Sequence, residues 1–282
     1  MKITQLNIYP VKSLGGIALD TAELTAEGLA WDRRWMVVDD VGRFVTQRQL
    51  PTMARIRVHL EADALVLSHP EVAPLRVPLA VGALPRIPVY VWEDRCEALD
   101  EGVEARDWLS DVLGDWRGSG LRLVRFAPEQ RRAVEPHYLA PGERAHTGFA
   151  DGYPLLVVSE GSLDEMNRRL AAKGLDPVPM SRFRPSLVVD HATPFAEDGW
   201  DTLAAADGAW RLGLRKPCQR CKITTVDQHS GEIAVPGEPL RTLVEMNTRA
   251  APGGYFGQNA IVLEGEGARL SVGDDITMRT RS

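Results

Sequence analysis

The sequence contains few cysteines and no long apolar segment. Three cysteines in 282 residues, Cys96, Cys218 and Cys221, cannot form the dense disulfide framework of a small secreted fold. So small a number of cysteines favours a protein of a reducing compartment. The segment Met1–Gly16 lacks the charged-then-apolar pattern of a signal peptide, and nowhere do about 18 apolar residues follow one another. We therefore expect a cytoplasmic protein that has no membrane partner.

The sequence also has no excess of positive charge. Lysine and arginine number 33 against 39 aspartates and glutamates, which gives a formal net charge of −6 and a pI near 5.6. This balance excludes a broad basic surface for nucleic acid but leaves room for one concentrated cationic pocket. With 44% hydrophobic and 26% charged residues, the composition is that of an ordinary globular protein. At about 150 residues per domain, the length suits one large domain or two of ordinary size.

Short strands dominate the structure predicted for the first part of the chain. In Arg55–Leu60 apolar and polar residues alternate, as expected of a strand with one buried and one wet face. A turn at residues 39–42 predicts a hairpin between Trp35–Val38 and Arg43–Gln47. We also expect a helix over Glu101–Leu113, and strands over Gln5–Tyr9, Leu65–Leu67, Val89–Trp92 and Leu121–Phe126.

The segment 127–150 is polar, rich in proline and glycine, and predicts either a domain boundary or an active-site loop. The helix expected after it begins at Ser162 as N-cap, with Glu165 completing a capping box, and ends at Gly174. A second helix is expected over Leu240–Met246, after Pro239, and strands over Leu155–Val158, Ser186–Asp190, Trp210–Leu214, Lys222–Asp227, Ala260–Leu263 and Asp275–Met278. These elements predict a mainly β fold with a few helices (α+β), arranged as two β-barrel units over residues 1–122 and 123–282.

The strongest chemical signal is the cysteine pair Cys218 and Cys221, which stands among four cations in the sequence RKPCQRCK, residues 215–222. Nearby positive charge favours a thiolate, which is both the nucleophile and the metal ligand. A four-ligand zinc site is disfavoured, because there is no second cysteine pair and the candidates Cys96, His191 and His229 lie at no recognised spacing.

A thioredoxin-type dithiol is disfavoured as well. Such a pair opens a helix, whereas the β-branched residues of Lys222–Asp227 predict a strand. Two interpretations stay open. One is a single thiolate that ligates a transition metal held mainly by a cofactor, and the other is a pair of buried structural cysteines.

Five short motifs occur in order along the chain: Ile8–Ser13 (IYPVKS), Asp32–Trp35 (DRRW), Arg182–Pro185 (RFRP), Cys218–Cys221 (CQRC) and Phe256–Asn259 (FGQN). Together they resemble the MOSC family, and within it the members that carry a MOSC N-terminal β-barrel domain, the amidoxime-reducing components among them. The resemblance extends from residue 1 to about residue 280. It implies an N-terminal β-barrel domain over residues 1–122 and a MOSC β-barrel domain over residues 123–282.

This resemblance further implies a molybdenum cofactor (Mo-molybdopterin), a pterin dithiolene that holds Mo and ends in a phosphate. Matched residue by residue, Cys221 is the expected protein ligand of the metal, and Asp151 joins it as the candidate catalytic acid or base, with His146 as a lesser alternative. Donors from distant segments suit an anionic group. The expected cofactor contacts are Lys12, Ser13, Arg33, Gly152, Tyr153, Arg184, Ser186, Gln219, Arg220 and Cys221.

The activity implied by the resemblance is the two-electron, two-proton reduction of N-hydroxylated substrates, such as amidoximes or hydroxylaminopurines, to the N–H compound and water. Family members of this type draw electrons from flavin, iron–sulfur or haem proteins. No cysteine follows Cys221, so we expect an external donor. A non-catalytic carrier of molybdenum cofactor or sulfur is the alternative, and Asp151 would be dispensable there. A β-barrel interaction protein without cofactor would leave the cationic motifs unexplained.

Overall fold

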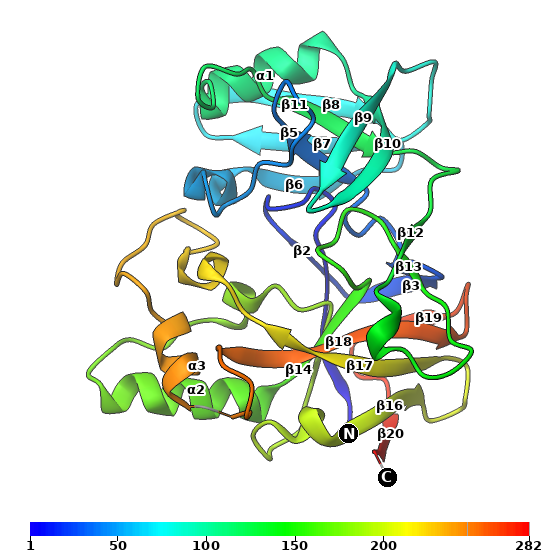
Figure 1. Cartoon of the computed structure of the whole chain (residues 1–282), viewed down its shortest axis with the longest axis vertical. Coiled ribbons are helices and arrows are strands. Elements are labelled where there is room, and N and C mark those ends of the chain that lie inside the picture. Colours follow the sequence, from blue (N-terminus) through cyan, green and yellow to red (C-terminus); the bar gives the residue numbers. More distant parts are fainter. Residues whose placement is uncertain (247, 282) are drawn as a thin grey trace.

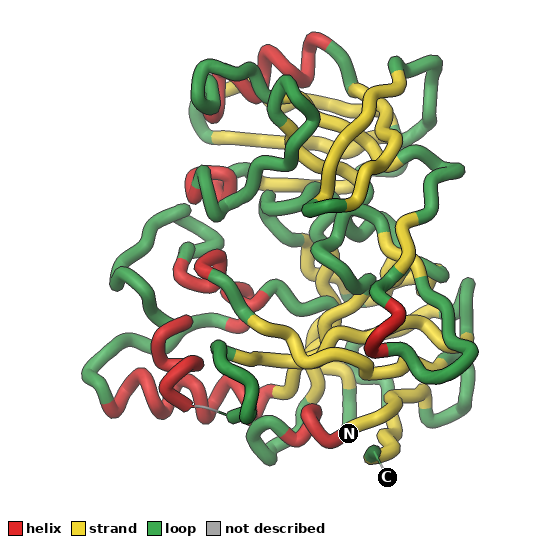
Figure 2. The backbone as a smooth tube through the Cα atoms, viewed as in Figure 1, coloured by secondary structure: helices red, strands yellow, loops and turns green. Residues whose placement is uncertain are grey.

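The computed structural model describes residues 1–246 and 248–281, and its chain forms two β-rich units, one above the other in Figure 1. Strands make up most of the regular structure in both units, as Figure 2 shows. The prediction of a mainly β fold with a few helices is therefore confirmed. Among the described residues, no helix has the length and apolar character needed to cross a membrane.

The upper unit is built from two antiparallel sheets and one helix. Helix α1 (Val103–Leu113) buries Trp108 and Leu109 in a core shared with both sheets. The helix predicted here is therefore confirmed. The first sheet has the order β5 (Trp35–Val38), β11 (Arg122–Phe126), β10 (Asp94–Asp100) and β9 (Arg86–Val91), and the second β6 (Arg57–Leu60), β7 (Ala64–His69) and β8 (Val72–Pro78).

The lower unit is built on an eight-stranded mixed sheet. Its strand order is β2 (Ile17–Leu19), β1 (Ile3–Ile8), β15 (Leu187–Val189), β14 (Leu155–Ser159), β18 (Tyr255–Glu264), β17 (Arg211–Gln219), β16 (Trp200–Ala205) and β20 (Ile276–Thr280). Only β14 and β15 pair in parallel among these described neighbours. Helices α2 (Glu160–Ala172) and α3 (Leu240–Met246) lie side by side at one end of the sheet, where Met166 and Leu243 share a core with Phe256.

The N-terminal residues belong to both units. Strand β1 pairs with β15 in the lower sheet, and β3 (Thr21–Thr25) pairs with β4 (Gly28–Leu29) and with β19 (Arg269–Ser271). The chain then enters the upper unit at β5. It returns through a short ribbon of β12 (Arg132–Ala133) and β13 (His146–Thr147), within the predicted loop 127–150. The domain division at residue 122 stays a prediction.

The hairpin predicted from Arg43–Gln47 forms only in part. Phe44 makes a single bridge to Val38, and no ladder continues beyond it. The hydroxyl of Thr46 instead donates to the side-chain carbonyl of Gln49 over 2.6 Å and accepts from the amide of Arg48 over 3.2 Å. These local side-chain bonds compete with strand pairing and turn the chain.

The strand predicted over Lys222–Asp227 is wrong. Residues Lys222–Thr225 form a short 3₁₀ helix. The hydroxyls of Thr224 and Thr225 donate to the carbonyls of Cys221 and Lys222 over 3.0 and 2.7 Å, which favours a helical turn over extended pairing. The residues after Cys221 therefore do not exclude a thioredoxin-type dithiol, although the 3₁₀ turn begins after the second cysteine and has only four residues.

The predicted N-cap of helix α2 is also wrong. The helix begins one turn earlier, with Ser159 as the N-cap whose hydroxyl accepts from the amide of Ser162. Both serine hydroxyls donate to the buried carboxylate of Glu197, which fixes this start. Glu165, predicted as the partner of a capping box, pairs instead with arginines one turn further along the helix. The helix predicted over Leu240–Met246 is confirmed as α3.

Replacing Gly257 with alanine should lower the free energy of unfolding by about 1–3 kcal/mol. Gly257 lies in β18 with φ +80°, and an added Cβ would come within 2.8 Å of the Val157 carbonyl oxygen. Chemical denaturation would measure the loss. Gly199→Ala is the matched control, because nothing lies within 4 Å of its added Cβ, and it should stay within about 0.5 kcal/mol. Equal effects of the two substitutions would contradict this account.

Candidate active site

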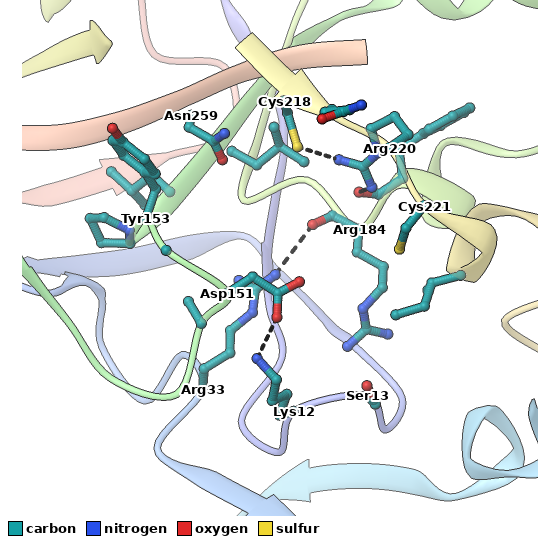
Figure 3. Close-up of a pocket in the computed structure, with 18 of the residues that line it drawn as sticks. Lys12, Ser13, Arg33, Asp151, Tyr153, Arg184, Cys218, Arg220, Cys221 and Asn259 are labelled. Atoms are coloured by element: carbon teal, nitrogen blue, oxygen red, sulfur yellow. Dashed lines mark hydrogen bonds and ion pairs between the residues drawn. The ribbon is translucent and has the colours of Figure 1, made fainter. Parts of the chain in front are cut away.

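A cavity of about 510 Å³ lies where the upper unit meets the lower sheet, a volume suited to a cofactor or substrate (Figure 3). Asp151 is the single carboxylate among the described residues that line it. In a chain of net charge −6, this cavity is therefore the concentrated cationic pocket that the composition allowed. The positive charges come from Lys12, Arg33, Arg48, Arg184 and Arg220.

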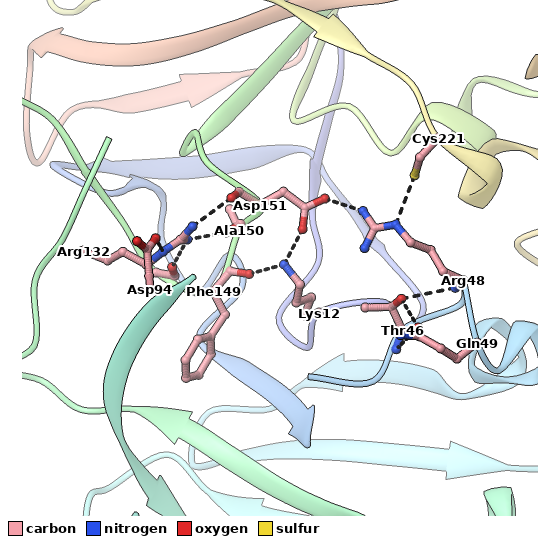
Figure 4. Close-up of polar contacts among 11 residues, drawn as sticks. Lys12, Thr46, Arg48, Gln49, Asp94, Arg132, Phe149, Ala150, Asp151 and Cys221 are labelled. Atoms are coloured by element: carbon pink, nitrogen blue, oxygen red, sulfur yellow. Dashed lines mark hydrogen bonds and ion pairs between the residues drawn. The ribbon is translucent and has the colours of Figure 1, made fainter. Parts of the chain in front are cut away.

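Lys12 is held at the floor of the cavity by two acceptors. Its ammonium group donates to the carbonyl of Phe149 and to a carboxylate oxygen of Asp151, each over 2.6 Å (Figure 4). Burial lowers the pKa of Lys12 to about 8, against the opposing effect of Asp151. Lys12 thus holds its positive charge at neutral pH and can release a proton only slightly above it.

Arg33 and Arg184 stack on the ring of Tyr9, at 4.5 and 4.1 Å from its centroid. Arg33 also pairs with the buried carboxylate of Asp32, whereas Arg184 donates to the carbonyl of Leu14 over 2.8 Å. Burial lowers the pKa of Arg184 to about 10, so this guanidinium remains charged at neutral pH. One aromatic ring thus positions two cations from segments about 150 residues apart in the chain.

Arg48 bridges the side of the cavity that carries Cys221 and the side that carries Asp151 (Figure 4). Its Nε donates to the sulfur of Cys221 over 3.4 Å, and its Nη2 donates to Asp151 over 2.8 Å. Desolvation would raise the pKa of Asp151, but the charges of Lys12 and Arg48 outweigh it and hold that pKa well below its usual range. Asp151 is therefore a carboxylate in this arrangement.

The two cysteines are free thiols with separate arginine partners. Cys218 is the last residue but one of strand β17 and accepts from Arg220 over 2.9 Å, while Cys221 immediately precedes the 3₁₀ turn and accepts from Arg48. Within the ranges that the structure describes, no three His, Cys, Asp or Glu side chains gather as a metal-binding set. A four-ligand zinc site therefore finds no ligand set among these side chains.

Arg132 fixes the loop that carries Asp151. Its buried guanidinium donates to the carbonyls of Gly148, Ala150 and Asp151, and its Nε donates to Asp94 over 2.6 Å (Figure 4). Three main-chain carbonyls held by one side chain leave this loop little freedom to move. The position of the Asp151 carboxylate is thereby fixed from the side of the loop opposite the cavity.

The backbone of the cavity wall is strained. A positive φ is uncommon outside glycine and costs about 1–3 kcal/mol, and such residues cluster at functional sites. Seven described non-glycine residues have a positive φ, and four of them line this cavity: Ser13 at 67°, Arg33 at 47°, Trp92 at 57° and Arg184 at 53°. Three of these four are residues predicted from the sequence as cofactor contacts.

The lining fits an anionic cofactor that offers a site to a thiolate. Among the described residues, Nη1 of Arg48 and Nε of Arg220 are buried and find no hydrogen-bond partner. Buried donors without acceptors cost about 1–3 kcal/mol each, and acceptors on a bound group would satisfy them. The donor set, rich in guanidinium groups beside a thiol, matches a phosphate- and metal-bearing group better than a neutral one.

Most of the residues predicted from the sequence meet here. The predicted residues that line the cavity are Lys12, Ser13, Arg33, Asp151, Gly152, Tyr153, Arg184, Gln219, Arg220 and Cys221. Ser186 does not: it is fully buried in the lower sheet, where its hydroxyl accepts from the amide of Leu156 over 3.2 Å. His146 lies on β13 and is not part of the lining either.

Sequence reasoning missed Arg48, Trp92 and Asn259 as cavity residues. Asn259 lies in the FGQN motif, so that motif contained the signal. Arg48 directly follows the segment interpreted as a returning strand, and Trp92 closes one. Nothing in the sequence singles out either of them.

Fold and site together define a class of protein: two β-rich units that enclose a cationic, thiol-bearing cavity. The family model described as the MOSC N-terminal beta barrel domain matches residues 1–116, and the MOSC domain model matches residues 144–277. The chain belongs to the MOSC family, in its form with the N-terminal beta barrel domain.

Among curated proteins, the chain is 34% identical to mitochondrial amidoxime-reducing component 1 of Mus musculus over 247 residues and to that of Homo sapiens over 250 residues. Each match covers 86% of this chain and 70% of the relative. Molybdenum cofactor sulfurase of Anopheles gambiae is 32% identical over 261 residues, which is 86% of this chain and 32% of that protein. The resemblance predicted from five motifs is therefore confirmed.

Affinity of the cofactor-free chain for sulfate, a dianion of constant charge between about pH 6 and 10, should fall as the pH rises through about 8. Lys12 loses its positive charge there, since a lowered pKa means that the charged form persists only below about 8. The fall should reach up to about tenfold per pH unit. Calorimetric titration at several pH values would measure it.

Lys12→Met should bind sulfate weakly and without this pH dependence. Lys222→Met removes an exposed cation that does not line the cavity and should behave like the unaltered chain. A pH dependence that persists in Lys12→Met would assign the titration to another group.

Arg132→Met should lower the free energy of unfolding by at least about 2 kcal/mol, because it leaves buried carbonyls without a donor. Amide hydrogen exchange should rise over residues 148–151. Arg131→Met, at the exposed neighbouring position, is the control and should change stability by less than about 0.5 kcal/mol. Unchanged exchange in Arg132→Met would show that the loop is fixed by other contacts.

Proposed function

We propose that this protein binds a molybdenum cofactor in the cationic cavity and reduces N-hydroxylated compounds, such as amidoximes and hydroxylaminopurines. The observation that carries the proposal is the convergence of five cations and two free thiols on one cavity. The relatives named amidoxime-reducing component support it at 34% identity. When bound, the molybdenum centre would supply two-electron redox chemistry at the substrate.

The chain's own side chains would hold the cofactor. Cys221 is the proposed ligand of the metal, since its sulfur faces the cavity beside Arg48. Lys12, Arg33 and Arg184 would bind the phosphate and the anionic dithiolene. Lys12 and Arg33 each pair with one carboxylate, Asp151 and Asp32. Arg184 is held by the Leu14 carbonyl and the Tyr9 ring, so its positive charge in particular is free to act on a bound anion.

Proton delivery would come from Lys12 rather than from Asp151. Reduction of an N–OH group to N–H and water takes up two protons, so a donor must be protonated near neutral pH. The lowered pKa of Lys12, about 8, suits that task. Asp151 carries no proton in this pH range and acts as the acceptor that positions Lys12 and Arg48.

Electrons would come from a separate flavin, iron–sulfur or haem protein. Cys96, the remaining thiol of the chain, is buried in the upper unit and does not line the cavity. Cys218 and Cys221 lie in the proposed cofactor site itself. A cytoplasmic location stays a prediction from the sequence.

A second candidate is a carrier that binds molybdenum cofactor or sulfur without turnover. The 32% identity to molybdenum cofactor sulfurase favours it, as does the second thiol, Cys218, which lines the same cavity with its own arginine partner. In that role both sulfurs would matter, whereas reduction requires Cys221 alone as the ligand.

Metal analysis of protein made in a host that synthesises the cofactor tests both candidates. We expect about one Mo per chain, lost in Cys221→Ser because the metal loses its protein ligand. Cys218→Ser is the matched control, a thiol in the same cavity that should leave the Mo content unchanged. Protein without Mo under these conditions would overturn both candidates.

Reduction of benzamidoxime with a chemical electron donor then separates the enzyme from the carrier. The Mo-loaded chain should form benzamidine, and Cys221→Ser should not. A loaded chain that reduces no N-hydroxylated compound would favour the carrier.

A further inference from the structure

A second cavity of about 320 Å³ opens on the upper unit, next to the cationic one. Four of its described lining residues are aromatic: Phe44, Tyr90, Trp92 and Trp116. Its charged lining is balanced, with two carboxylates, Asp39 and Glu93, and two guanidinium groups, Arg43 and Arg117. Aromatic walls with balanced charge suit a neutral planar group, in contrast to the anion-binding character of the first cavity.

Trp92 lines both cavities and forms the boundary between them. The Arg48 guanidinium lies 4.8 Å from the centre of its ring, and Phe44 makes a T-shaped contact with the same ring at 5.0 Å between centroids. The same guanidinium donates to the sulfur of Cys221. The Trp92 ring and the proposed metal ligand therefore lie on either side of one side chain, Arg48. A small substrate could contact both.

Trp92 occupies a backbone position that is energetically unfavourable for tryptophan. Trp92 and Glu93 form the two-residue turn between β9 and β10, with Val91 paired to Asp94. Favoured turns of this length place glycine, asparagine or aspartate first, because that residue has a positive φ. Trp92 takes φ +57° there and leaves 47% of its surface exposed. Neither turn formation nor core packing accounts for a tryptophan at this position.

We propose that Trp92 and the second cavity form a subsite for the planar aromatic part of the substrate, whose N-hydroxyl group then points into the cationic cavity. This inference rests on the proposed reductase function and names the residues that would hold the ring of a substrate such as benzamidoxime or a hydroxylaminopurine. The ring stacks on Trp92 and enters between the aromatic walls. Gln49, on the cavity lining, offers an amide to polar atoms at the ring edge.

Binding of benzamidoxime without any electron donor tests the subsite apart from turnover. Calorimetric titration of the Mo-loaded chain should show binding, and Trp92→Asn should weaken it about tenfold through loss of the stacking surface. Asparagine tolerates a positive φ, so this variant keeps the turn, and its thermal unfolding temperature should not fall. Trp92→Phe should retain most of the affinity. Acetamidoxime, which has no ring, should bind both the unaltered chain and Trp92→Asn equally.

Trp31→Asn is the matched control. Trp31 is also a tryptophan with a positive φ, 68°, and 41% exposure, but it lines neither cavity. It should bind benzamidoxime like the unaltered chain. Equal affinity in Trp92→Asn and Trp31→Asn, an equal loss for acetamidoxime, or no binding of benzamidoxime by the unaltered chain would each overturn the subsite. Ring-dependent binding without turnover would support the subsite and count against the reductase.

Discussion

The carboxylate of Asp151 is the contact on which the cavity depends. It accepts from Lys12 and from Arg48, two cations that the N-terminal and upper parts of the chain bring to the loop before β14. Without a negative charge between them, these cations would repel each other across a partly desolvated space. Arg132 donates to main-chain carbonyls of the loop that carries Asp151, so the position of this carboxylate is fixed as well.

The other cations of the cavity are held mostly by groups without a formal charge. Arg184 uses the carbonyl of Leu14 and the ring of Tyr9, and Arg220 uses the carbonyl of Phe183. Gly16 lies directly against the Tyr9 ring, where an added Cβ would come within 2.5 Å of it. Dipoles and aromatic faces stabilise a guanidinium without neutralising it. The cavity therefore keeps a net positive charge inside an acidic protein.

The features that local patterns encode were predictable from the sequence. The alternation in Arg57–Leu60 and the apolar stripe of α1 follow from the burial of one face, and the five motifs contain half of the cavity lining. The errors arose where a side chain overrides the backbone pattern. Hydroxyls of Thr46, Thr224 and Thr225 bond to neighbouring groups and replace expected strands with turns. Arg48 reaches the cavity because of such a turn. The turn at Trp92 was not predictable, because its first residue is not one of those that usually mark a two-residue turn.

The placement of β1 makes assembly of the lower unit depend on distant parts of the chain. Its residues Ile3–Ile8 pair with Leu187–Val189, and Thr21–Thr25 pairs with Arg269–Ser271. The whole upper unit lies between these partners in sequence, so closing the lower sheet requires long loops whose entropy must be lost before any contact forms. During synthesis on the ribosome, β1 waits until β15 has emerged. The upper unit is complete in the chain before most of the lower sheet has been synthesised, and the cavity, which needs both units, cannot form until β17 and β18 have emerged.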